Sequence, residues 1–417
     1  MGLFCQALVR CRSAEGIQDR RKTRSSISQL RVTETDKHHV LITGWRGIPH
    51  SYAVISQFLC LEFLCRDDVC LYFEDRSFYD PEWNKVTGLF SPEDEAAIAG
   101  IPGIPDRFLA DFELRISFPF DLVTPPKAKR FAIYATSESL VVPPEFIVDQ
   151  VPLRNAHSLH SATIFTTSNW SSEGFLASGA DPTRLRVVPL GVDPAIFHPV
   201  SHDDRNEYRN DRKIGENDFV FVFIGAMTGN KNPELAIRTF AAVLRDHPRC
   251  RLLLKGSDSL YPSYQLFKSA MLASLSGVDF GNVFSRLTYI GDDLSVAEMA
   301  KLYQLSDCYI SPYKAEGFNL PVLEAAACGL PVICTSGGPT DDFTNDKFAW
   351  RISSHRKQLD SGTHLEPDAD HFEKLMREIV MDEAFSEQAS IYGPKHVHEN
   401  FTWKNTCDLI LKDLSNE

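Results

Sequence analysis

Short apolar runs alternate with longer amphipathic stretches along most of the chain. The run 219–224 is almost entirely apolar, which is typical of a strand buried on both faces. The stretch 233–244 repeats apolar residues at helical spacing and therefore predicts a helix. The same patterns predict a strand that begins at residue 39, strands at 69–73, 130–134, 161–166, 186–189, 251–254, 287–290, 308–311 and 331–334, and helices at 51–64, 168–179, 264–275, 296–305 and 320–328.

This alternation of strands and helices predicts an α/β protein built from parallel βαβ units. A polar, proline-bearing stretch at 191–214 separates two such series and marks a candidate domain boundary. We expect two Rossmann-like, doubly wound domains at 38–200 and 201–375. They should face a cleft, because ligands bind at the carboxyl ends of the strands in such folds. The last segment, 376–417, is expected to form helices that pack back towards the first domain, with a break at 393–394.

Residues 1–37 differ from the rest because they are rich in Arg and Ser and have little apolar periodicity. We expect a disordered leader there. An organelle-targeting segment is the alternative, and Glu15 and Asp19 argue against it. Gln6 stands where N-myristoylation requires Ser or Thr.

Length and charge narrow the class of protein. The chain has 417 residues, more than a single hydrophobic core usually serves, which agrees with two domains. Its 43% apolar and 24% charged residues are typical of a soluble globular protein. The formal net charge of −13 repels polyanions, so nucleic acid is not expected as a partner.

The ten cysteines form no Cys-x-x-Cys pair, and several lie inside apolar runs, as reduced and buried thiols do. We therefore expect a reducing, cytoplasmic environment. The longest apolar stretch, 52–64, contains Gln57 and Glu62, so no membrane span is expected, and a peripheral membrane contact stays open. No histidine or carboxylate motif suggests a bound metal, and we expect neither a metal nor another cofactor.

A loop before the helix at 320–328 carries the first of two carboxylates that lie eight residues apart. Glu316 precedes the helix and can accept hydrogen bonds from sugar hydroxyls, while Glu324 lies two turns deeper and can hold a ribose diol with both oxygens. Gly317 lets a ligand approach the backbone closely. The N–H groups at the positive end of this helix suit a pyrophosphate, and they belong to Phe318, Asn319 and Leu320. As an alternative, a glutamate at a helix entrance only complements the helix dipole.

The surrounding string is more specific than this spacing. Glu316-Gly-Phe-Asn-Leu-Pro-Val-Leu-Glu-Ala-Ala-Ala-Cys-Gly-Leu-Pro-Val-Ile closely resembles the signature of family-4 retaining glycosyltransferases, of the GT-B superfamily and glycosyl transferases group 1. Other segments are similar to this family: Phe223-Ile-Gly225 with Lys231, the strand end at Lys255-Gly256, Thr167-Ser-Asn-Trp170, and Asn400-Phe-Thr-Trp403. The resemblance covers roughly residues 40 to 415. It implies a GT-B fold in which the first domain holds the acceptor and the second holds a nucleotide sugar.

In this family two basic groups of the second domain neutralise the donor's diphosphate, because negative charge grows on the leaving group as the glycosidic bond breaks. The resemblance assigns this role to Lys231 and Lys255, with Gly225 in the same donor site. The family often carries an arginine near the first lysine, where this chain has Ala226 and Asn230. We therefore expect Lys255 to carry more of the phosphate charge.

The loop 44–52 resembles the family's first loop, and its small residues let an acceptor or a donor sugar approach. We expect Gly47, His50 and Ser51 to take part, although Ser51 is equally suited to be a plain N-cap. Glu138 lies in a segment that resembles a Glu-Ser element in one branch of the family, and we expect it to bind the acceptor hydroxyl. An ordinary loop acid is the alternative.

Together these features predict a retaining transferase that moves a sugar from a nucleoside-diphosphate donor to the hydroxyl of a glycan, lipid or small molecule. The resemblance implies attack from the face of the leaving group, whose phosphate helps to deprotonate the acceptor. Two alternatives stay open: a GT-B-like epimerase or phosphorylase, and a protein that binds a sugar nucleotide or glycan without turnover, which the missing arginine motivates. The residues expected in catalysis are Glu316, Lys231, Lys255, Glu138 and His50, and those expected at the donor are Glu324, Gly317, Phe318, Asn319, Leu320, Gly225, Gly47 and Ser51.

Overall fold

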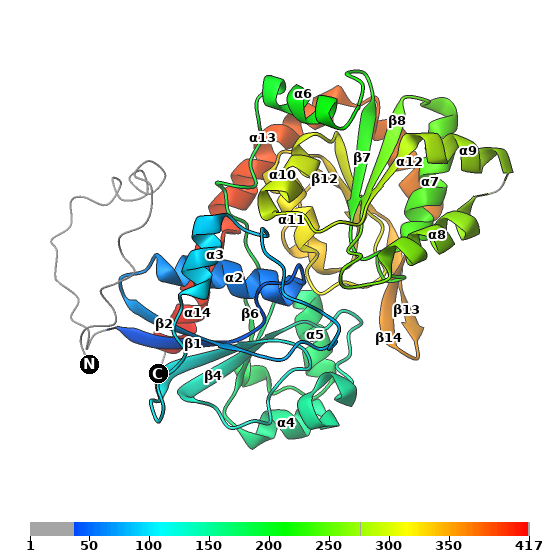
Figure 1. Cartoon of the computed structure of the whole chain (residues 1–417). Helices are drawn as coiled ribbons and strands as arrows, with labels where there is room; N and C mark the ends of the chain where they lie inside the picture. The colour runs from blue at the N-terminus through cyan, green and yellow to red at the C-terminus, as the bar shows by residue number, and fades with distance from the viewer. Residues whose placement is uncertain (1–36, 276, 416–417) are drawn as a thin grey trace.

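Two six-stranded parallel sheets, one in each half of the chain, organise the molecule (Figure 1). The computed structural model describes residues 37–275 and 277–415, so the expected leader lies, except for its last residue, outside the described residues. The strand orders are β2-β1-β3-β4-β5-β6 and β12-β11-β10-β7-β8-β9, and neighbouring strands run parallel in both sheets. The prediction of two doubly wound α/β domains is confirmed.

The first domain alternates strands and helices in the expected way. Its strands are β1 (His38–Gly44), β2 (Val69–Asp75), β3 (Ala110–Ile116), β4 (Ala128–Ala135), β5 (Thr163–Thr166) and β6 (Leu185–Val187). Its helices are α2 (Ser51–Leu64), α3 (Pro92–Ala99), α4 (Leu153–Leu159) and α5 (Asn169–Ala177), with short 3-10 turns η2 (Pro144–Phe146), η3 (Val148–Gln150) and η4 (Pro182–Arg184).

The second domain repeats this arrangement. Its strands are β7 (Phe219–Ile224), β8 (Cys250–Lys255), β9 (Leu287–Ile290), β10 (Cys308–Ser311), β11 (Val332–Thr335) and β12 (Ala349–Ile352), and β13 (Ser354–Leu359) pairs antiparallel with β14 (Gly362–Pro367). Its helices are α6 (His202–Asp211), α7 (Pro233–Asp246), α8 (Ser263–Ser274), α9 (Gly277–Arg286), α10 (Val296–Gln304), α11 (Leu320–Ala327) and α12 (Ala369–Ile379), with the turn η5 (Pro339–Asp342). The last helices are α13 (Glu383–Asn400) and α14 (Trp403–Ser415).

Strand β3 is an element that the sequence patterns miss, because Glu113 and Arg115 interrupt its apolar residues. Both side chains are buried and form an ion pair of 2.8 Å between Arg115 Nε and Glu113 Oε1. Arg115 also donates to the backbone carbonyls of Asp121 and Thr124, each at 2.9 Å. A charged pair that satisfies itself in this way can occupy a central strand, which no pattern of hydrophobic residues indicates.

The expected break at 393–394 is wrong, since α13 runs without interruption through Gly393 and Pro394. A side chain at Gly393 would place its Cβ 2.7 Å from the carbonyl oxygen of Ala326 in α11. The glycine therefore allows α13 to pack closely on α11 instead of ending the helix.

Helix α14 lies against the first domain, although it is the last helix of the described chain (Figure 1). The indole of Trp403 stacks on the ring of Phe58 in α2, with ring centroids 5.2 Å apart. Arg66 donates to Asp408 at 2.6 Å, and the backbone N–H of Val192 donates to Phe401 at 3.0 Å. The first domain is thus completed by residues from the end of the chain.

The β13–β14 hairpin of the second domain also contacts the first domain. The N–H of Thr363 donates to the carbonyl of Ser139 at 2.8 Å. Arg356 forms a two-pronged ion pair with Glu173 of α5, at 2.6 and 2.9 Å, and lies over the ring of Trp170. The hairpin therefore spans the two domains beside the loop that carries Glu138.

Candidate functional site

The residues proposed from the sequence lie just after strands, at the carboxyl ends of the two sheets. In the second domain Lys231 follows β7, Lys255 ends β8 and Glu316 follows β10. In the first domain His50 follows β1 and Glu138 follows β4. The parallel topology thus brings loops that are far apart in the sequence to the same edges.

A charged cluster joins the two domains. It consists of Lys231 and Glu316 of the second domain and Glu138 of the first. The ammonium of Lys231 donates to Oε1 of the buried Glu316. Burial opposes the charge of Lys231, but the carboxylates of Glu316 and Glu138 outweigh it and raise the pKa of the lysine. The cluster therefore holds a permanent positive charge between two acids.

Asn230 joins the parts of this cluster. Its side-chain amide donates to Oε2 of Glu138 and to the carbonyl of Ala315, each at 3.2 Å. Its own carbonyl accepts from the N–H of Lys314 at 2.7 Å. Where the resembling family often has an arginine, this chain has a residue that fixes the Glu316 loop.

The side chain of Glu138 is exposed to water. It also lies near Asn230, Lys231 and Glu316 of the second domain. Partial loss of hydration between the two domains raises the pKa of Glu138, and the positive charge of Lys231 opposes this rise. A carboxyl group in this position can form a hydrogen bond with a hydroxyl group of an acceptor.

Lys255 is buried, and its ammonium donates to the carbonyl of Gly256. Burial lowers its pKa, which Asp293, Asp258 and Asp292 partly offset. In residues 37–275 and 277–415 it forms no ion pair with any carboxylate. The structure therefore places Lys255 beside the end of β7, opposite Ile224, and shows no contact between its side chain and Glu316 among the described residues.

The entrance of α11 has the geometry that an anion requires. Asn319 is its N-cap in a left-handed conformation with φ of 74°, and its side chain donates to Ser311 at 2.9 Å. No group in the described part of the chain accepts a hydrogen bond from the N–H groups of Phe318, Asn319 or Leu320. Unpaired donors at the positive end of a helix attract negative charge. The buried Phe318 ring packs on Phe343, with ring centroids 4.7 Å apart.

Gly317 permits close contact between the domains. A Cβ at this position would lie 2.4 Å from the Cβ of Thr136. Its carbonyl accepts hydrogen bonds from Thr167 at 2.8 Å and Ser168 at 2.7 Å. The sequence suggested that this glycine admits a ligand, whereas here the first domain fills the space. Gly225 is similarly confined by Lys231, whose Cγ would lie 3.3 Å from an added Cβ.

Glu324 lies apart from this cluster, inside the second domain. The hydroxyl of the buried Tyr303 donates to its Oε2 at 2.6 Å. Burial raises the pKa of Glu324 to about 7, although the Tyr303 hydrogen bond lowers it. One of the two oxygens expected to hold a ribose diol is therefore already engaged.

His50 is the N-cap of α2, and Ser51 is an exposed first residue of that helix. Nδ1 of His50 accepts a hydrogen bond from the N–H of Tyr52 at 3.2 Å. The ring lies between Trp83 and Tyr52, and burial lowers the pKa of His50 to about 4. The suggestion that Ser51 is the cap is wrong, because the imidazole takes that role. Gly47 has φ of 77° and donates to Gln57, away from the charged cluster.

Four neighbours of the site are not among the residues proposed from the sequence. Trp83 of the first domain donates from its indole to the carbonyl of Leu260 in the second, at 3.1 Å. Tyr261 lies near Glu138 and Lys231, and burial raises its pKa. The hydroxyls of Tyr52 and Thr136 are 3.2 Å apart. A polar residue soon after a strand end, such as Tyr261, is the one clue that could have been used.

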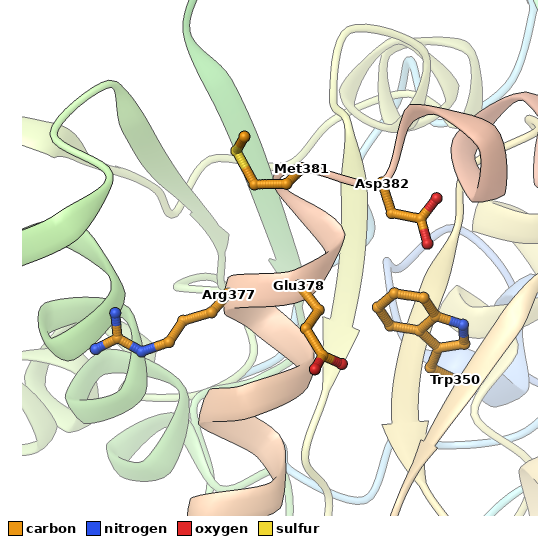
Figure 2. Close-up of a pocket in the computed structure, with 5 residues that line it drawn as sticks. All are labelled: Trp350, Arg377, Glu378, Met381 and Asp382. Atoms are coloured by element: carbon orange, nitrogen blue, oxygen red, sulfur yellow. The ribbon is translucent and has the colours of Figure 1, made fainter.

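An open hollow of about 570 Å³ lies elsewhere on the second domain. Figure 2 shows its lining, which consists of Trp350, Arg377, Glu378, Met381 and Asp382. None of the residues proposed from the sequence lines this hollow. In the described part of the chain no helix is long and apolar enough to cross a bilayer, and no three His, Cys, Asp or Glu side chains are grouped as metal ligands.

A family model described as glycosyl transferases group 1 matches residues 204–396, which include Lys231, Lys255 and Glu316. Residues 204–396 are a glycosyl transferases group 1 domain. The group 1 domain contains all of the second sheet and helix α11.

Relatives of known name match the chain in part. The D-inositol 3-phosphate glycosyltransferase of Rhodococcus erythropolis is 27% identical over 237 residues, which are 56% of this chain and 49% of that protein. The enzyme of the same name from Acidothermus cellulolyticus is 30% identical over 202 residues, which are 47% of this chain and 43% of that protein. The chain thus spans about half the length of these two relatives.

Solved structures match the whole architecture. A glycosyltransferase from Rickettsia africae has a TM-score of 0.66 at 13% identity and covers 92% of this chain and 100% of its own. Anabaena HepE in complex with UDP-glucose has a TM-score of 0.65 at 12% identity and covers 91% of this chain and 100% of its own. The group 1 domain and the domain before it therefore form a GT-B fold.

Proposed function

We propose that this chain is a retaining glycosyltransferase that moves a sugar from a nucleoside-diphosphate donor to a hydroxyl acceptor. The proposal rests on the cluster of Lys231, Glu316 and Glu138, in which a cation and two carboxylates from both domains meet at the carboxyl ends of strands. This is where an acceptor bound to the first domain would meet a donor bound to the second.

The donor diphosphate is expected at the entrance of α11. There the N–H groups of Phe318, Asn319 and Leu320 lack acceptors among the described residues, and an anion would satisfy them. Among the described residues the buried cation of Lys255 forms no ion pair with a carboxylate, and a phosphate would supply its counter-charge. Because UDP-glucose is bound in Anabaena HepE, a UDP sugar is the first donor to test.

In the proposed reaction the bond between the anomeric carbon and the phosphate oxygen breaks, and a bond to the acceptor oxygen forms on the same face. The acceptor proton passes to the leaving phosphate. Lys231 would exchange Glu316 for this phosphate and stabilise its growing charge, while Glu316 would accept hydrogen bonds from the sugar. Glu138 would bind the acceptor hydroxyl, and the free oxygen of Glu324 would bind the ribose.

We also propose that the reaction needs no metal, because two lysines and the N-terminus of α11 supply positive charge at the phosphates. Activity should therefore persist in EDTA. Six buried cysteines of the described chain are free thiols, which agrees with a reducing, cytoplasmic location.

The test combines binding and turnover. Purified protein is heated with UDP-, GDP- and ADP-glucose, and the true donor should raise the Tm in proportion to the logarithm of its concentration. With that donor, Lys231→Met should lower kcat/KM by about 10²- to 10³-fold, as the loss of one charge-stabilising donor does. Lys374→Met changes an exposed lysine of α12 and is the matched control.

The outcomes separate the candidates. Stabilisation together with transfer or donor hydrolysis supports the proposal. Stabilisation without either reaction identifies a sugar-nucleotide-binding protein. If no nucleotide sugar stabilises the protein and none is consumed, the transferase assignment is wrong.

A further inference from the structure

We propose that the acceptor of this enzyme is a neutral molecule whose ring packs against three aromatic side chains, Tyr79, Phe118 and Phe146, which we call the aromatic row. This inference rests on the proposed function and specifies the chemistry of its second substrate. It is carried by the arrangement of aromatic rings and paired charges at the carboxyl edge of the first sheet.

The aromatic row lies where three strands of the first sheet end. Tyr79 follows β2, Phe118 follows β3, and Phe146 lies in η2 after β4. The ring centroids of Tyr79 and Phe118 are 5.0 Å apart, and those of Phe118 and Phe146 are 5.1 Å apart. Tyr79 is 60% exposed, so the end of the row is open to a ligand.

Further rings connect the row to the charged cluster. Phe120 lies 5.7 Å from Phe118 and 6.3 Å from Tyr52, measured between ring centroids. The hydroxyl of Tyr52 bonds to Thr136, which abuts Gly317 beside Glu316. Packed rings therefore link the row to Thr136 and to the loop of Glu316, where the donor is proposed to bind.

A second path leads from the row to the group 1 domain. Trp83 lies 6.5 Å from Tyr79, 5.3 Å from His50 and 6.2 Å from Tyr261, between ring centroids. A series of packed aromatic rings thus connects the row with the group 1 domain. Ring faces bind the C–H faces of sugars and the faces of other rings by dispersion and electrostatic contact.

The cations at this edge already have carboxylate partners. Arg46 forms two hydrogen bonds with Asp75, at 3.1 and 2.9 Å, and Lys85 pairs with the same carboxylate at 2.9 Å. Arg76 pairs with the buried Asp121 at 2.8 Å.

Two acids are sequence neighbours of the row. Asp80 follows Tyr79, and Glu145 precedes Phe146. An anionic acceptor would meet these acids, and the three described cations Arg46, Lys85 and Arg76 are already paired with carboxylates, so a neutral acceptor is favoured.

The experiment compares three acceptor probes with the donor that the protein uses. 4-Nitrophenyl glucoside presents a planar ring, maltose presents sugar rings alone, and glucose 6-phosphate carries charge. We expect transfer to at least one neutral probe in preference to glucose 6-phosphate. Preference for 4-nitrophenyl glucoside over maltose would identify the recognised ring as aromatic, and equal use would identify it as a sugar.

Variants test the row itself. Tyr79→Ala should raise the KM for the neutral acceptor about 3- to 10-fold, the effect of losing one aromatic contact, and leave the KM for the donor unchanged. Tyr79→Phe keeps the ring and should retain the original value. Phe284→Ala removes an aromatic ring that is 65% exposed on α9 and should have no effect.

Donor hydrolysis without acceptor is the independent readout. If the donor is hydrolysed but glucose 6-phosphate is the best acceptor, or if Tyr79→Ala behaves like Phe284→Ala, this inference is wrong and the proposed function stands. If no donor is bound or hydrolysed, the proposed function itself has failed.

Discussion

Burial determines the protonation of Glu324, whose carboxyl group lies inside the second domain with the Tyr303 hydroxyl as its partner. Its pKa of about 7 in the folded chain lies above the ordinary value of 4.5 for a glutamate, since burial penalises the charged form. The folded state is therefore more stable when the carboxyl group of Glu324 is neutral than when it is charged. That contribution is complete below pH 4.5 and is lost as the pH rises through about 7.

Glu324→Gln should remove this pH dependence. Between pH 5 and 8 the free energy of unfolding of the original protein should fall by about 2 kcal/mol relative to the variant, which follows from 1.36 kcal/mol for each pKa unit. Urea unfolding at four pH values measures the difference. Glu378→Gln, at an exposed position of α12, should run parallel to the original protein, and parallel curves for Glu324→Gln would contradict the assignment.

The buried Arg115 offers a second test on single residues. Arg115→Met leaves the carboxylate of Glu113 inside β3 without its cation, and such losses cost about 3–5 kcal/mol. Lys129→Met breaks the exposed pair with Asp111 and should cost at most about 1 kcal/mol. Denaturant unfolding compares the two, and equal costs would show that the buried pair does not stabilise the fold.

For single residues, the sequence predicts the position of the candidate site residues in the fold better than the contacts that each of them makes. Lys231 and Glu316 follow apolar runs, so their place at strand ends could be predicted. The cap formed by His50 and the packing of Gly317 on Thr136 could not, because both depend on neighbours that are distant in the sequence. The roles assigned to the site residues stay predictions until variants are measured.

Among the elements, the β13–β14 hairpin joins the domains through Arg356 and Glu173. Both side chains are half exposed, so the pair contributes modestly and should weaken in salt. Its position beside the Ser139 carbonyl means that the Glu138 loop and the arrangement of the domains are coupled.

A charge-reversal cycle tests this contact. Arg356→Glu and Glu173→Arg should each favour a more open arrangement by about 1 kcal/mol, and the double variant should restore the original. Small-angle scattering at low and high salt measures the radius of gyration. If the double variant is as open as the singles, the contact does not hold the domains together.

Element prediction succeeded where hydrophobic periodicity was strong and failed where polar pairs or close packing decided the structure. The runs that became β7 and β10 are almost uninterrupted, and both were predicted. Strand β3 was missed because Glu113 and Arg115 pair inside it. The continuity of α13 was missed because Gly393 serves packing against Ala326, which a sequence pattern does not reveal.

For the whole molecule, the contact of α14 with α2 is the feature that makes the two halves of the chain interdependent. Trp403→Ala should destabilise the first domain by about 3–5 kcal/mol, because it removes a buried ring that stacks on Phe58. Hydrogen exchange should accelerate in α2. Leu409→Ala, at a position of α14 that is 42% exposed, should leave exchange in α2 almost unchanged.

Trp403→Phe refines this test. The indole N–H of Trp403 is buried without an acceptor among the described residues. Phenylalanine keeps a ring against Phe58 and removes the unpaired donor, so it should cost less than alanine. An equal loss for both variants would mean that the stacking contributes little.

The same contact sets an order of events while the protein is being made. Helix α2 leaves the ribosome before its partner α14, which begins about 340 residues later in the sequence. At roughly 5 to 20 residues per second, α2 waits on the order of tens of seconds with its Phe58 face uncovered. A nascent chain in that interval presents an apolar helix surface to the cell. Chaperone binding during synthesis should therefore end when α14 emerges.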